Sequence, residues 1–455
     1  MDVLNFNSLH GFGELKMVID NRFLRINEHN HLVIGGCDTV ELAGKFGTPL
    51  YVLDENYIRH NVRRFKRAMD RYYGEKSLVL YASKALCITA ICRIMDQEGI
   101  GLDVVSGGEL YTARKAGFPM ERVYFHGNNK SERELNEAVE ANVRRIVVDN
   151  IHELKLLDRI CGERGVKAQI SVRVKPGIEA HTHEYIMTGQ IDSKFGVAIE
   201  NSEIYDFVTV AKRCPNVELV GIHCHIGSQI METKPFEKTA EVMLDLIADL
   251  RENFDISITE LNLGGGFGIR YTDEDRTPEY ERYIEMVSRT IKNYCNIRNI
   301  EQPFILIEPG RAIVGPAGIT LYTVGAIKTI KNVRKYVAVD GGMSDNPRYA
   351  LYGSKYSFVL ANKVNSSITQ SVTIAGKHCE SGDLIGKDVL MPDMEPGDIM
   401  AVLATGAYNY SMSMNYNRTG RPPMVLCRDG KARIIVKGED YEDIVRNDII
   451  PEDLL

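Results

Sequence analysis

The 455-residue sequence predicts an α/β fold, a (β/α)₈ TIM-like barrel followed by an all-β C-terminal domain. Between about residues 77 and 310, eight short apolar runs rich in β-branched residues alternate with segments of helical periodicity. Such runs are typical of parallel strands that are buried on both faces. An open doubly wound sheet would give the same alternation. We favour the barrel because polar residues and glycines follow nearly all eight runs, at the end of a barrel where active sites form.

The predicted barrel strands cover residues 77–83, 101–106, 122–127, 145–150, 168–175, 219–227, 259–266 and 304–310. Helical periodicity between them predicts helices over 109–117, 131–142 and 152–165. The second of these helices begins with Ser131 and Glu134, a pair that can form a capping box. The third ends at Gly165, and a glycine suits the left-handed turn at a helix C-terminus. These start and stop signals support the alternation of strands and helices.

A second domain is predicted after residue 312, where strand-like runs follow one another with few helical segments. The runs cover 319–330, 335–339, 371–375, 399–404, 424–427 and 432–436. Asp429 and Gly430 separate the last two and are a strong hairpin signal. Residues 22–34 also alternate, so we expect the N-terminal segment 1–48 to pair with this domain. The barrel is then predicted over 49–312 and the β domain over 313–455.

Composition excludes several classes of protein. Apolar residues make up 44% of the chain, charged residues 26%, and the formal net charge is −7. Without a basic run, nucleic acid and anionic membranes are poor partners. No apolar run reaches the ~18 residues of a membrane span, and no secretory signal is visible. The nine cysteines include no Cys-x-x-Cys pair, which argues against a disulfide framework and a structural zinc site. We expect a cytoplasmic protein.

Candidate catalytic residues lie where the predicted strands end. Lys84 follows the first strand, where desolvation would lower its pKa and make its amine nucleophilic; an ordinary surface lysine is the alternative. His223 and His225 share one face of the sixth strand, and His181 and His183 repeat their spacing. Either pair could hold a metal, as in an amidohydrolase barrel. We expect His225 to stack on a flat cofactor instead, although a core histidine is the plainer interpretation.

Two glycine-rich turns follow the seventh and eighth strands, GGGFG at 264–268 and EPGR at 308–311. Glycines let backbone N–H groups converge on a phosphate, and barrels often bind one after these strands. Glu308 is a candidate inward carboxylate, with an ordinary salt bridge as the alternative. Arg311 and Arg348 could hold an acidic substrate, because arginine binds a carboxylate through two parallel hydrogen bonds.

Nine motifs occur in the order found in a known family. They are YASKA, GLDVVSGGEL, HTHEYIMTGQIDSKFG, HCHIGSQ, LNLGGGFG, EPGR, SDNPRYALY, CESGD and GAYNYSM. A single motif such as GGGFG is weak evidence, but nine in order are very specific. From about residue 30 onward the sequence resembles the diaminopimelate decarboxylases, which are fold-type III decarboxylases that use pyridoxal 5′-phosphate (PLP). The resemblance implies a barrel plus a β domain, in agreement with the prediction made from the residues.

The resemblance implies roles around the cofactor, carried over position by position. Lys84 resembles the lysine that bonds covalently to PLP, His225 the histidine stacked on its ring, and Glu308 the carboxylate that pairs with the pyridine nitrogen. A nearby anion favours the protonated ring, which is the electron sink of the reaction. Phosphate-side contacts are implied for Ser228, Gly265, Gly266, Gly310, Arg311 and Tyr408. Positions lining the cofactor pocket are implied for Asp103, Glu109 and Arg173.

The resemblance also implies a substrate, an acid and an assembly. The residues implied to bind meso-2,6-diaminopimelate are Arg311, Arg348, Tyr352, Glu380 and Tyr408. The arginines would meet the distal carboxylate of this substrate, and Glu380 its ammonium. Cys379 resembles the proton donor, which comes with Glu380 from the partner subunit of a homodimer. The implied reaction yields L-lysine and CO₂, the last step of lysine biosynthesis.

Three other functions stay open at this point. A related PLP decarboxylase could act on arginine, ornithine or carboxynorspermidine, although CESGD and the two arginines argue against it. A PLP-binding regulatory protein without turnover is usually a lone barrel, so the predicted β domain argues against it. A metal amidohydrolase would carry zinc, but no carboxylate-and-histidine set is evident that would complete its metal shell.

Overall fold

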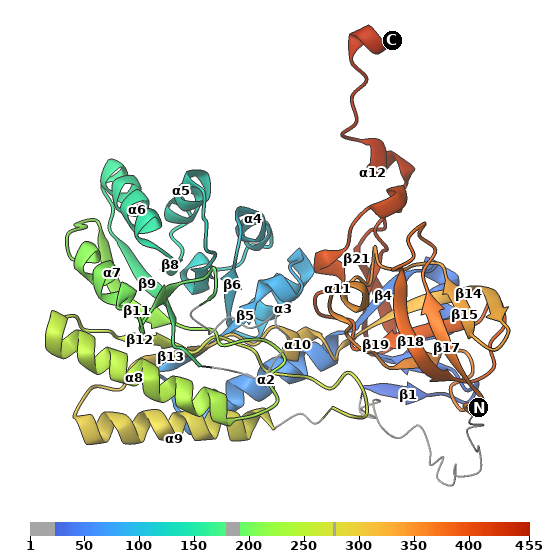
Figure 1. The fold of residues 1–455 in the computed structure, drawn as a ribbon, viewed down its shortest axis with the longest axis horizontal. Helices are drawn as coiled ribbons and strands as arrows, with labels where there is room; N and C mark the ends of the chain where they lie inside the picture. Colours follow the sequence, from blue (N-terminus) through green and yellow to red (C-terminus); the bar gives the residue numbers. More distant parts are fainter. Residues whose placement is uncertain (1–22, 179–191, 276–278) are drawn as a thin grey trace.

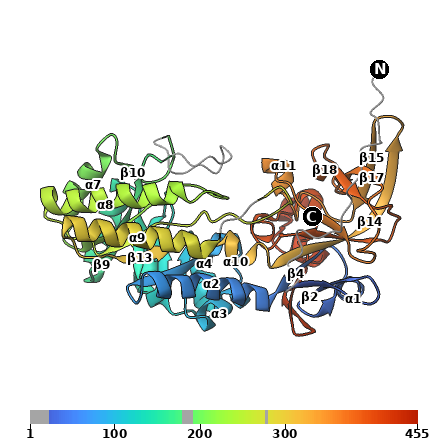
Figure 2. The ribbon, with the colours of Figure 1, turned by 90° about the horizontal axis from the view of Figure 1, so that it is seen from below.

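The computed structural model describes residues 23–178, 192–275 and 279–455. Figure 1 shows two bodies side by side, a barrel built from the middle of the chain and a mainly β domain built from the last third together with the N-terminal strands. The view from below in Figure 2 shows α2 (Glu55–Tyr72) running beneath the barrel toward the β domain.

The barrel is closed by eight parallel strands. They are β5 (Ser77–Ala82), β6 (Gly101–Val104), β7 (Val123–Phe125), β8 (Arg145–Val148), β9 (Ala168–Lys175), β11 (Val217–His223), β12 (Glu260–Asn262) and β13 (Phe304–Ile307). Pairing runs through them in order, and the contacts of β8 with β9 and of β13 with β5 complete the ring. These two pairings confirm the barrel and exclude the open sheet. A short strand, β10 (Val197–Ala198), adds to β9 outside the ring.

Helices follow the strands and cover the outside of the barrel. They are α3 (Thr89–Gln97), α4 (Gly107–Lys115), α5 (Glu132–Glu140), α6 (Ile151–Arg164), α7 (Glu203–Ala211), α8 (Lys234–Phe254) and α9 (Tyr280–Arg298). The capping box of Ser131 and Glu134 is present, and Gly165 ends α6 in the left-handed conformation, as predicted. The helix after β13, α10 (Arg311–Val314), is short, and α2 packs against α9, α10 and β5. None of the helices in the described residues combines the length and hydropathy that crossing a bilayer requires.

The second domain is built on one large, mostly antiparallel sheet. Its strands are β4 (Leu50–Asp54), β14 (Gly318–Ile330), β15 (Arg334–Val339), β16 (Phe358–Leu360), β17 (Gln370–Ala375), β18 (Leu384–Met391), β19 (Ile399–Leu403), β20 (Met424–Arg428) and β21 (Lys431–Val436). The hairpin predicted at Asp429 and Gly430 joins β20 to β21, with φ of 51° and 77° at its two turn residues. Two short helices, α11 (Arg348–Tyr352) and α12 (Tyr441–Val445), lie in this part of the chain.

The sequence prediction missed β16 and β18. In β18 the alternation of apolar and polar residues is broken, because its pairing with β17 shifts register and Asp388 adopts a positive φ of 57°. An irregular edge strand of this kind leaves no clean period-two pattern. β16 has three residues, which is too short for such a pattern to be visible.

The N-terminal part of the chain packs against the β domain. β1 (Leu24–Ile26), β2 (Leu32–Ile34) and β3 (Cys37–Asp38) form a small sheet of their own, followed by α1 (Thr39–Phe46). Backbone hydrogen bonds join this segment to the β domain, from Leu32 N–H to the Ala361 carbonyl at 2.8 Å and from Gly430 N–H to the Gly35 carbonyl at 2.9 Å. β4 belongs to the large sheet although it lies inside the predicted barrel range 49–312, so the chain enters the barrel at α2.

Asp345 is buried inside the β domain, in the turn before α11. Its Oδ1 accepts a hydrogen bond from Tyr322 Oη, and its Oδ2 accepts one from Gly342 N–H at 3.0 Å. Tyr51 Oη donates to the Asp345 carbonyl oxygen at 2.5 Å. Burial, opposed in part by the hydrogen bond from Tyr322, raises the pKa of Asp345 from 3.8 to about 7.

We expect this carboxyl to make the fold less stable as the pH rises. Because its pKa is raised in the folded state, its stabilising effect is complete below about pH 4 and is lost as the pH rises through about 7. Between pH 5 and pH 8 the loss is about 3 kcal/mol. Urea unfolding of Asp345→Asn should lack this part of the pH dependence, whereas Asp388→Asn, at an exposed carboxyl, should keep it. A variant that keeps the full loss would contradict the assignment.

Candidate active site

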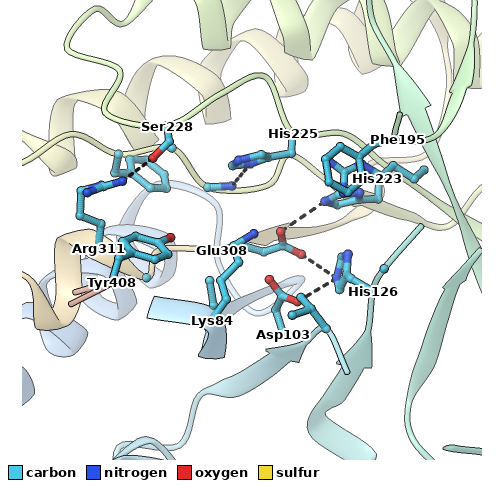
Figure 3. Close-up of a pocket in the computed structure, with 18 of the residues that line it drawn as sticks. Lys84, Asp103, His126, Phe195, His223, His225, Ser228, Glu308, Arg311 and Tyr408 are labelled. Atoms are coloured by element: carbon cyan, nitrogen blue, oxygen red, sulfur yellow. Dashed lines mark hydrogen bonds and ion pairs between the residues drawn. The ribbon is translucent and has the colours of Figure 1, made fainter. Parts of the chain in front are cut away.

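A cavity of about 390 Å³ opens at the C-terminal ends of the barrel strands, where the barrel meets the β domain. This volume lies within the range of small-molecule and cofactor sites. Figure 3 shows Lys84 and Glu308 in the middle of the cavity, with Ser228, Arg311 and Tyr408 on one side. The opposite side carries Asp103, His126, His223 and Phe195. Side chains that the sequence separates by more than two hundred residues therefore share one pocket.

Three side chains surround the Glu308 carboxylate. Glu308 lies directly after β13, is 4% exposed, and accepts a hydrogen bond from Asn262 Nδ2 at 2.7 Å. His126 Nε2 lies 3.0 Å from Oε1, and His223 Nε2 lies 3.2 Å from Oε2. Burial acts to raise the pKa of Glu308, but the two histidines outweigh it and hold that pKa well below the ordinary value. Glu308 is therefore an ionised carboxylate inside the barrel mouth.

Lys84 lies on a single 3₁₀ turn, Ser83–Ala85, that follows β5. Burial lowers the pKa of its amine, but Asp103, Tyr408 and Glu308 raise it, and the pKa lies above its ordinary value. The expectation that desolvation makes this amine neutral is therefore wrong for the chain by itself. Two carboxylates in the same cavity stabilise the ammonium by more than burial destabilises it.

His225 packs against the glycine turn that follows β12. Its Nδ1 accepts a hydrogen bond from Gly265 N–H at 3.2 Å, which fixes the plane of the ring. A side chain at Gly265 would collide with the backbone, because its Cβ would lie 2.1 Å from the Glu308 carbonyl oxygen. Gly266 adopts a positive φ of 100°, which favours glycine. The turn can therefore lie close to a ligand, as its sequence predicted.

Arg311 links the barrel to the β domain beside the glycine turns. Its Nη2 donates to Ser228 Oγ at 2.7 Å, and its guanidinium lies 4.6 Å from the ring centre of Tyr408. Tyr408 belongs to the β domain, and its N–H donates to the Ala85 carbonyl at 2.9 Å, next to Lys84. Gly310 precedes Arg311 and also lines the cavity. The residues implied on the phosphate side thus come together on one wall.

A second arginine reaches the same cavity from α11. Arg348 lines it together with Tyr352, as expected for the substrate side. The phenol oxygen of Tyr271 accepts hydrogen bonds from both arginines, 2.6 Å from Arg311 Nη1 and 2.7 Å from Arg348 Nη1. Burial acts to raise the pKa of Tyr271, but the two guanidinium groups outweigh it and lower that pKa. Tyr271 therefore fixes the spacing of the two cations.

The remaining residues implied at the site lie in different places. Asp103 and Arg173 line the cavity, and the Arg173 guanidinium lies 4.2 Å from the ring centre of Phe195. Glu109 is not a lining residue of this cavity; its Oε2 accepts a hydrogen bond from Val105 N–H at 2.8 Å. Within the described part of the chain, Cys379 and Glu380 also lie away from the cavity, exposed on the loop between β17 and β18.

Sequence reasoning missed His126 and Phe195 as pocket residues, and it missed Tyr271 as the residue that joins Arg311 to Arg348. His126 directly follows β7, which is the same strand-end signal that singled out Lys84 and Glu308. Tyr271 and Phe195 lie in loops, where no periodicity or spacing marks a side chain as inward-facing.

The structure offers a different set of possible metal ligands from the His-x-His pairs considered from the sequence. His223 forms a possible donor set with His126 and Glu308, not with His225. The second His-x-His pair, His181 and His183, lies outside the described residues.

Comparison of the sequence with known protein families agrees with the residues found in the pocket. Residues 55–315 match the family model for "Pyridoxal-dependent decarboxylase, pyridoxal binding domain". This match, together with the lysine, the carboxylate and the glycine turn at the barrel mouth, places the chain among the pyridoxal-dependent decarboxylases. The family match argues against the amidohydrolase alternative, because the matched region contains every strand of the barrel.

Whole-chain similarity gives the particular family. The chain is 50% identical to the diaminopimelate decarboxylase of Bacillus methanolicus, covering 91% of this chain and 95% of that protein. It is 48% identical to that of Bacillus subtilis, over 93% and 97% of the two chains. The crystal structure of the M. jannaschii enzyme in complex with L-lysine superposes with a TM-score of 0.90 at 37% identity, over 96% and 99%. The chain belongs to the diaminopimelate decarboxylase family.

Proposed function

We propose that this protein decarboxylates meso-2,6-diaminopimelate to L-lysine and CO₂, the last step of lysine biosynthesis. The observation that carries the proposal is the pair Arg311 and Arg348, held by Tyr271 in the cavity that also contains Lys84. The relatives at 48–50% identity are diaminopimelate decarboxylases, and the M. jannaschii and Helicobacter pylori structures of that enzyme hold L-lysine.

The pocket fits PLP. Asp103 Oδ1 and Arg311 Nε are buried polar atoms without a hydrogen-bond partner among the described residues, and both residues line the cavity. Lys84 would hold the cofactor covalently, His225 would lie on the ring, and Glu308 would face the pyridine nitrogen. Ser228, Gly265, Gly266, Gly310, Arg311 and Tyr408 would hold the phosphate. When bound, the cofactor supplies an electron sink for the bond to the departing carboxylate.

The chain's own residues then have three tasks. Lys84 would supply the amine that holds the cofactor before the substrate binds. Glu308 presents a negative charge at the place where a protonated pyridine nitrogen is needed. Arg311 and Arg348 would hold the carboxylate at the far end of the substrate and so set the orientation of the bond to the departing carboxylate. A substrate without that second carboxylate, such as ornithine, leaves buried donors unpaired and is disfavoured.

The proton donor comes, in this proposal, from a second copy of the chain. Cys379 and Glu380 are exposed and lie away from the cavity of their own chain, while the family resemblance assigns them to the site. Apolar residues on the C-terminal extension are also exposed, notably Ile449 at 87% and Leu455 at 91%. Figure 1 shows this extension leaving the body of the molecule. A homodimer would cover such surface and supply Cys379 and Glu380 across the interface.

We also place the protein in the cytoplasm. All nine cysteines lie in the described part of the chain and are free thiols, as expected in a reducing compartment. No nucleic acid or membrane partner is proposed.

The test of the activity is release of CO₂ from meso-2,6-diaminopimelate, with and without added PLP, beside arginine, ornithine and carboxynorspermidine. We expect PLP-dependent release with a kcat/KM for diaminopimelate at least about 10³-fold above the others, because the rejected substrates leave buried arginine donors unpaired. Faster turnover of one of the other amines would replace the proposed substrate. Binding of PLP without any CO₂ release would favour the regulatory alternative.

Tyr271→Phe is expected to raise KM for diaminopimelate by about tenfold, with a smaller change in kcat. The phenol oxygen accepts two charged hydrogen bonds, each worth about 1.5–3 kcal/mol, and part of this is lost as the arginines spread apart. Steady-state kinetics measure the change. Tyr111→Phe, at a tyrosine that is 63% exposed, is the matched control. An unchanged KM in Tyr271→Phe would show that the arginines hold their spacing without it.

A further inference from the structure

The carboxylate of Glu308 is contacted by side chains from the ends of three barrel strands. Asn262 is the last residue of β12, His223 the last residue of β11, and His126 the first residue after β7. Asn262 and His126 contact Oε1 at 2.7 and 3.0 Å, and His223 contacts Oε2 at 3.2 Å. A carboxylate offers about four acceptor positions. Asn262 and His223 are hydrogen-bonded to the carboxylate and His126 lies at ion-pair distance, so Glu308 can still accept a further hydrogen bond.

All of these groups are removed from water. The exposed fractions are 4% for Glu308, 3% for His126, 1% for His223 and 2% for Asn262. The two imidazoles pack edge to face, with ring centres 4.6 Å apart and planes at 74°. A buried carboxylate is costly unless hydrogen bonds to its charged form stabilise it. The histidines therefore act on the charge of Glu308 as well as on its orientation.

His223 differs from a cationic partner in one important respect. Burial lowers the pKa of His223 to about 3, so its ring is neutral and donates Nε2–H without adding a positive charge. An arginine in its place would neutralise Glu308 and weaken its attraction for a second cation. A neutral donor stabilises the anion and leaves the full negative charge available to the cavity.

We propose that His126 and His223 are positioning residues that keep Glu308 ionised and so keep the proton on the pyridine nitrogen of the bound cofactor. This inference rests on the proposed function, because it assigns Glu308 to that nitrogen. Both histidines lower the proton affinity of the carboxylate. Without them, the proton that the oxygen and the nitrogen share moves to the oxygen, and the neutral pyridine is a weaker electron sink.

The test uses His126→Leu and His223→Leu, which remove the ring nitrogens beside Glu308, and His126→Gln and His223→Gln, which keep an N–H group. His152→Leu, at an exposed position on α6, is the matched control. Each full-length protein is loaded with PLP labelled with ¹⁵N in the pyridine ring. Solid-state ¹⁵N NMR then reports whether that nitrogen is protonated, and steady-state CO₂ release from diaminopimelate gives kcat and KM. A purely structural role would not move the ¹⁵N signal.

We expect a protonated nitrogen in the wild type, the Gln variants and His152→Leu, and an unprotonated one in the Leu variants. Their kcat should fall by about tenfold to a hundredfold, the value of a hydrogen bond to a charged group, with KM within about threefold. A protonated nitrogen in folded, PLP-loaded Leu variants would overturn the proposal. So would Gln variants that behave like the Leu variants, or a zinc ion bound stoichiometrically by His126, His223 and Glu308 in the wild type.

Circular dichroism identifies any Leu variant that does not fold, in which case the Gln variants decide. A folded Gln variant with a protonated nitrogen supports the proposal, and one with an unprotonated nitrogen overturns it. The assay also separates this inference from the proposed function. If the wild type releases no CO₂ from diaminopimelate, the proposed function fails, while the ¹⁵N signals still test the role of the two histidines.

Discussion

Lys84→Ala is expected to lower CO₂ release from diaminopimelate by at least about 10³-fold, because the variant loses the only nucleophile proposed for the reaction. Lys84 is the lysine that lies in the cavity with Asp103 and Glu308, and the geometry provides no substitute amine among its described lining residues. The variant should still fold, since Lys84 lies on a single turn that lines the cavity and does not belong to the apolar core. Single-turnover CO₂ release measures the loss of activity. Mass spectrometry of borohydride-reduced protein measures whether the cofactor is still covalently attached.

Lys76→Ala is the matched control for this substitution. Lys76 is a half-exposed lysine just before β5, and its ion pair with Glu301 at 2.7 Å is on the surface. We expect wild-type turnover and full retention of covalently reduced cofactor in this variant. A Lys84→Ala protein with turnover within tenfold of wild type, or with the cofactor still attached after reduction, would refute the assignment of Lys84.

Cys379→Ala is expected to reduce kcat by about 10²- to 10⁴-fold, the usual contribution of a positioned general acid. The thiol is exposed on a loop whose backbone is held by a hydrogen bond from Cys379 N–H to Asn417 Oδ1 at 2.9 Å. Ser381→Ala, an exposed neighbour in the same loop, should leave kcat unchanged. Equal rates in wild type and Cys379→Ala would remove Cys379 as the acid without affecting the assignment of Lys84.

Mixing the two inactive variants tests whether the acid crosses a subunit boundary. Random exchange of Lys84→Ala and Cys379→Ala subunits makes half of the dimers hybrid, and each hybrid has one of its two composite sites intact. About a quarter of wild-type activity should therefore return after dissociation and reassociation. If Lys84 and Cys379 acted within one chain, every site in every dimer would lack one of them, and no activity would return.

The sequence by itself determined most of the barrel and the ends of its strands. Parallel strands buried on both faces must be continuously apolar, and the capping box of Ser131, the glycine at 165 and the Asp429–Gly430 turn depend on neighbours a few residues away. For the same reason Lys84, Glu308 and Arg311 could be placed at the cavity from the sequence, because the end of a strand is a local property. Order and spacing of the nine motifs were enough to indicate the family.

Only the tertiary structure decided which side chains meet. His126, Asn262 and His223 converge on Glu308 because closure of the ring brings the ends of β7, β11, β12 and β13 to one mouth, which no local pattern encodes. Tyr271 joins two arginines from different domains. The direction of the Lys84 pKa also depends on this closure, since desolvation and nearby carboxylates oppose each other and their balance depends on distance. Turns, caps and strand ends depend on residues nearby in sequence. The pKa values of Lys84 and Glu308 depend on residues that only the folded chain brings together.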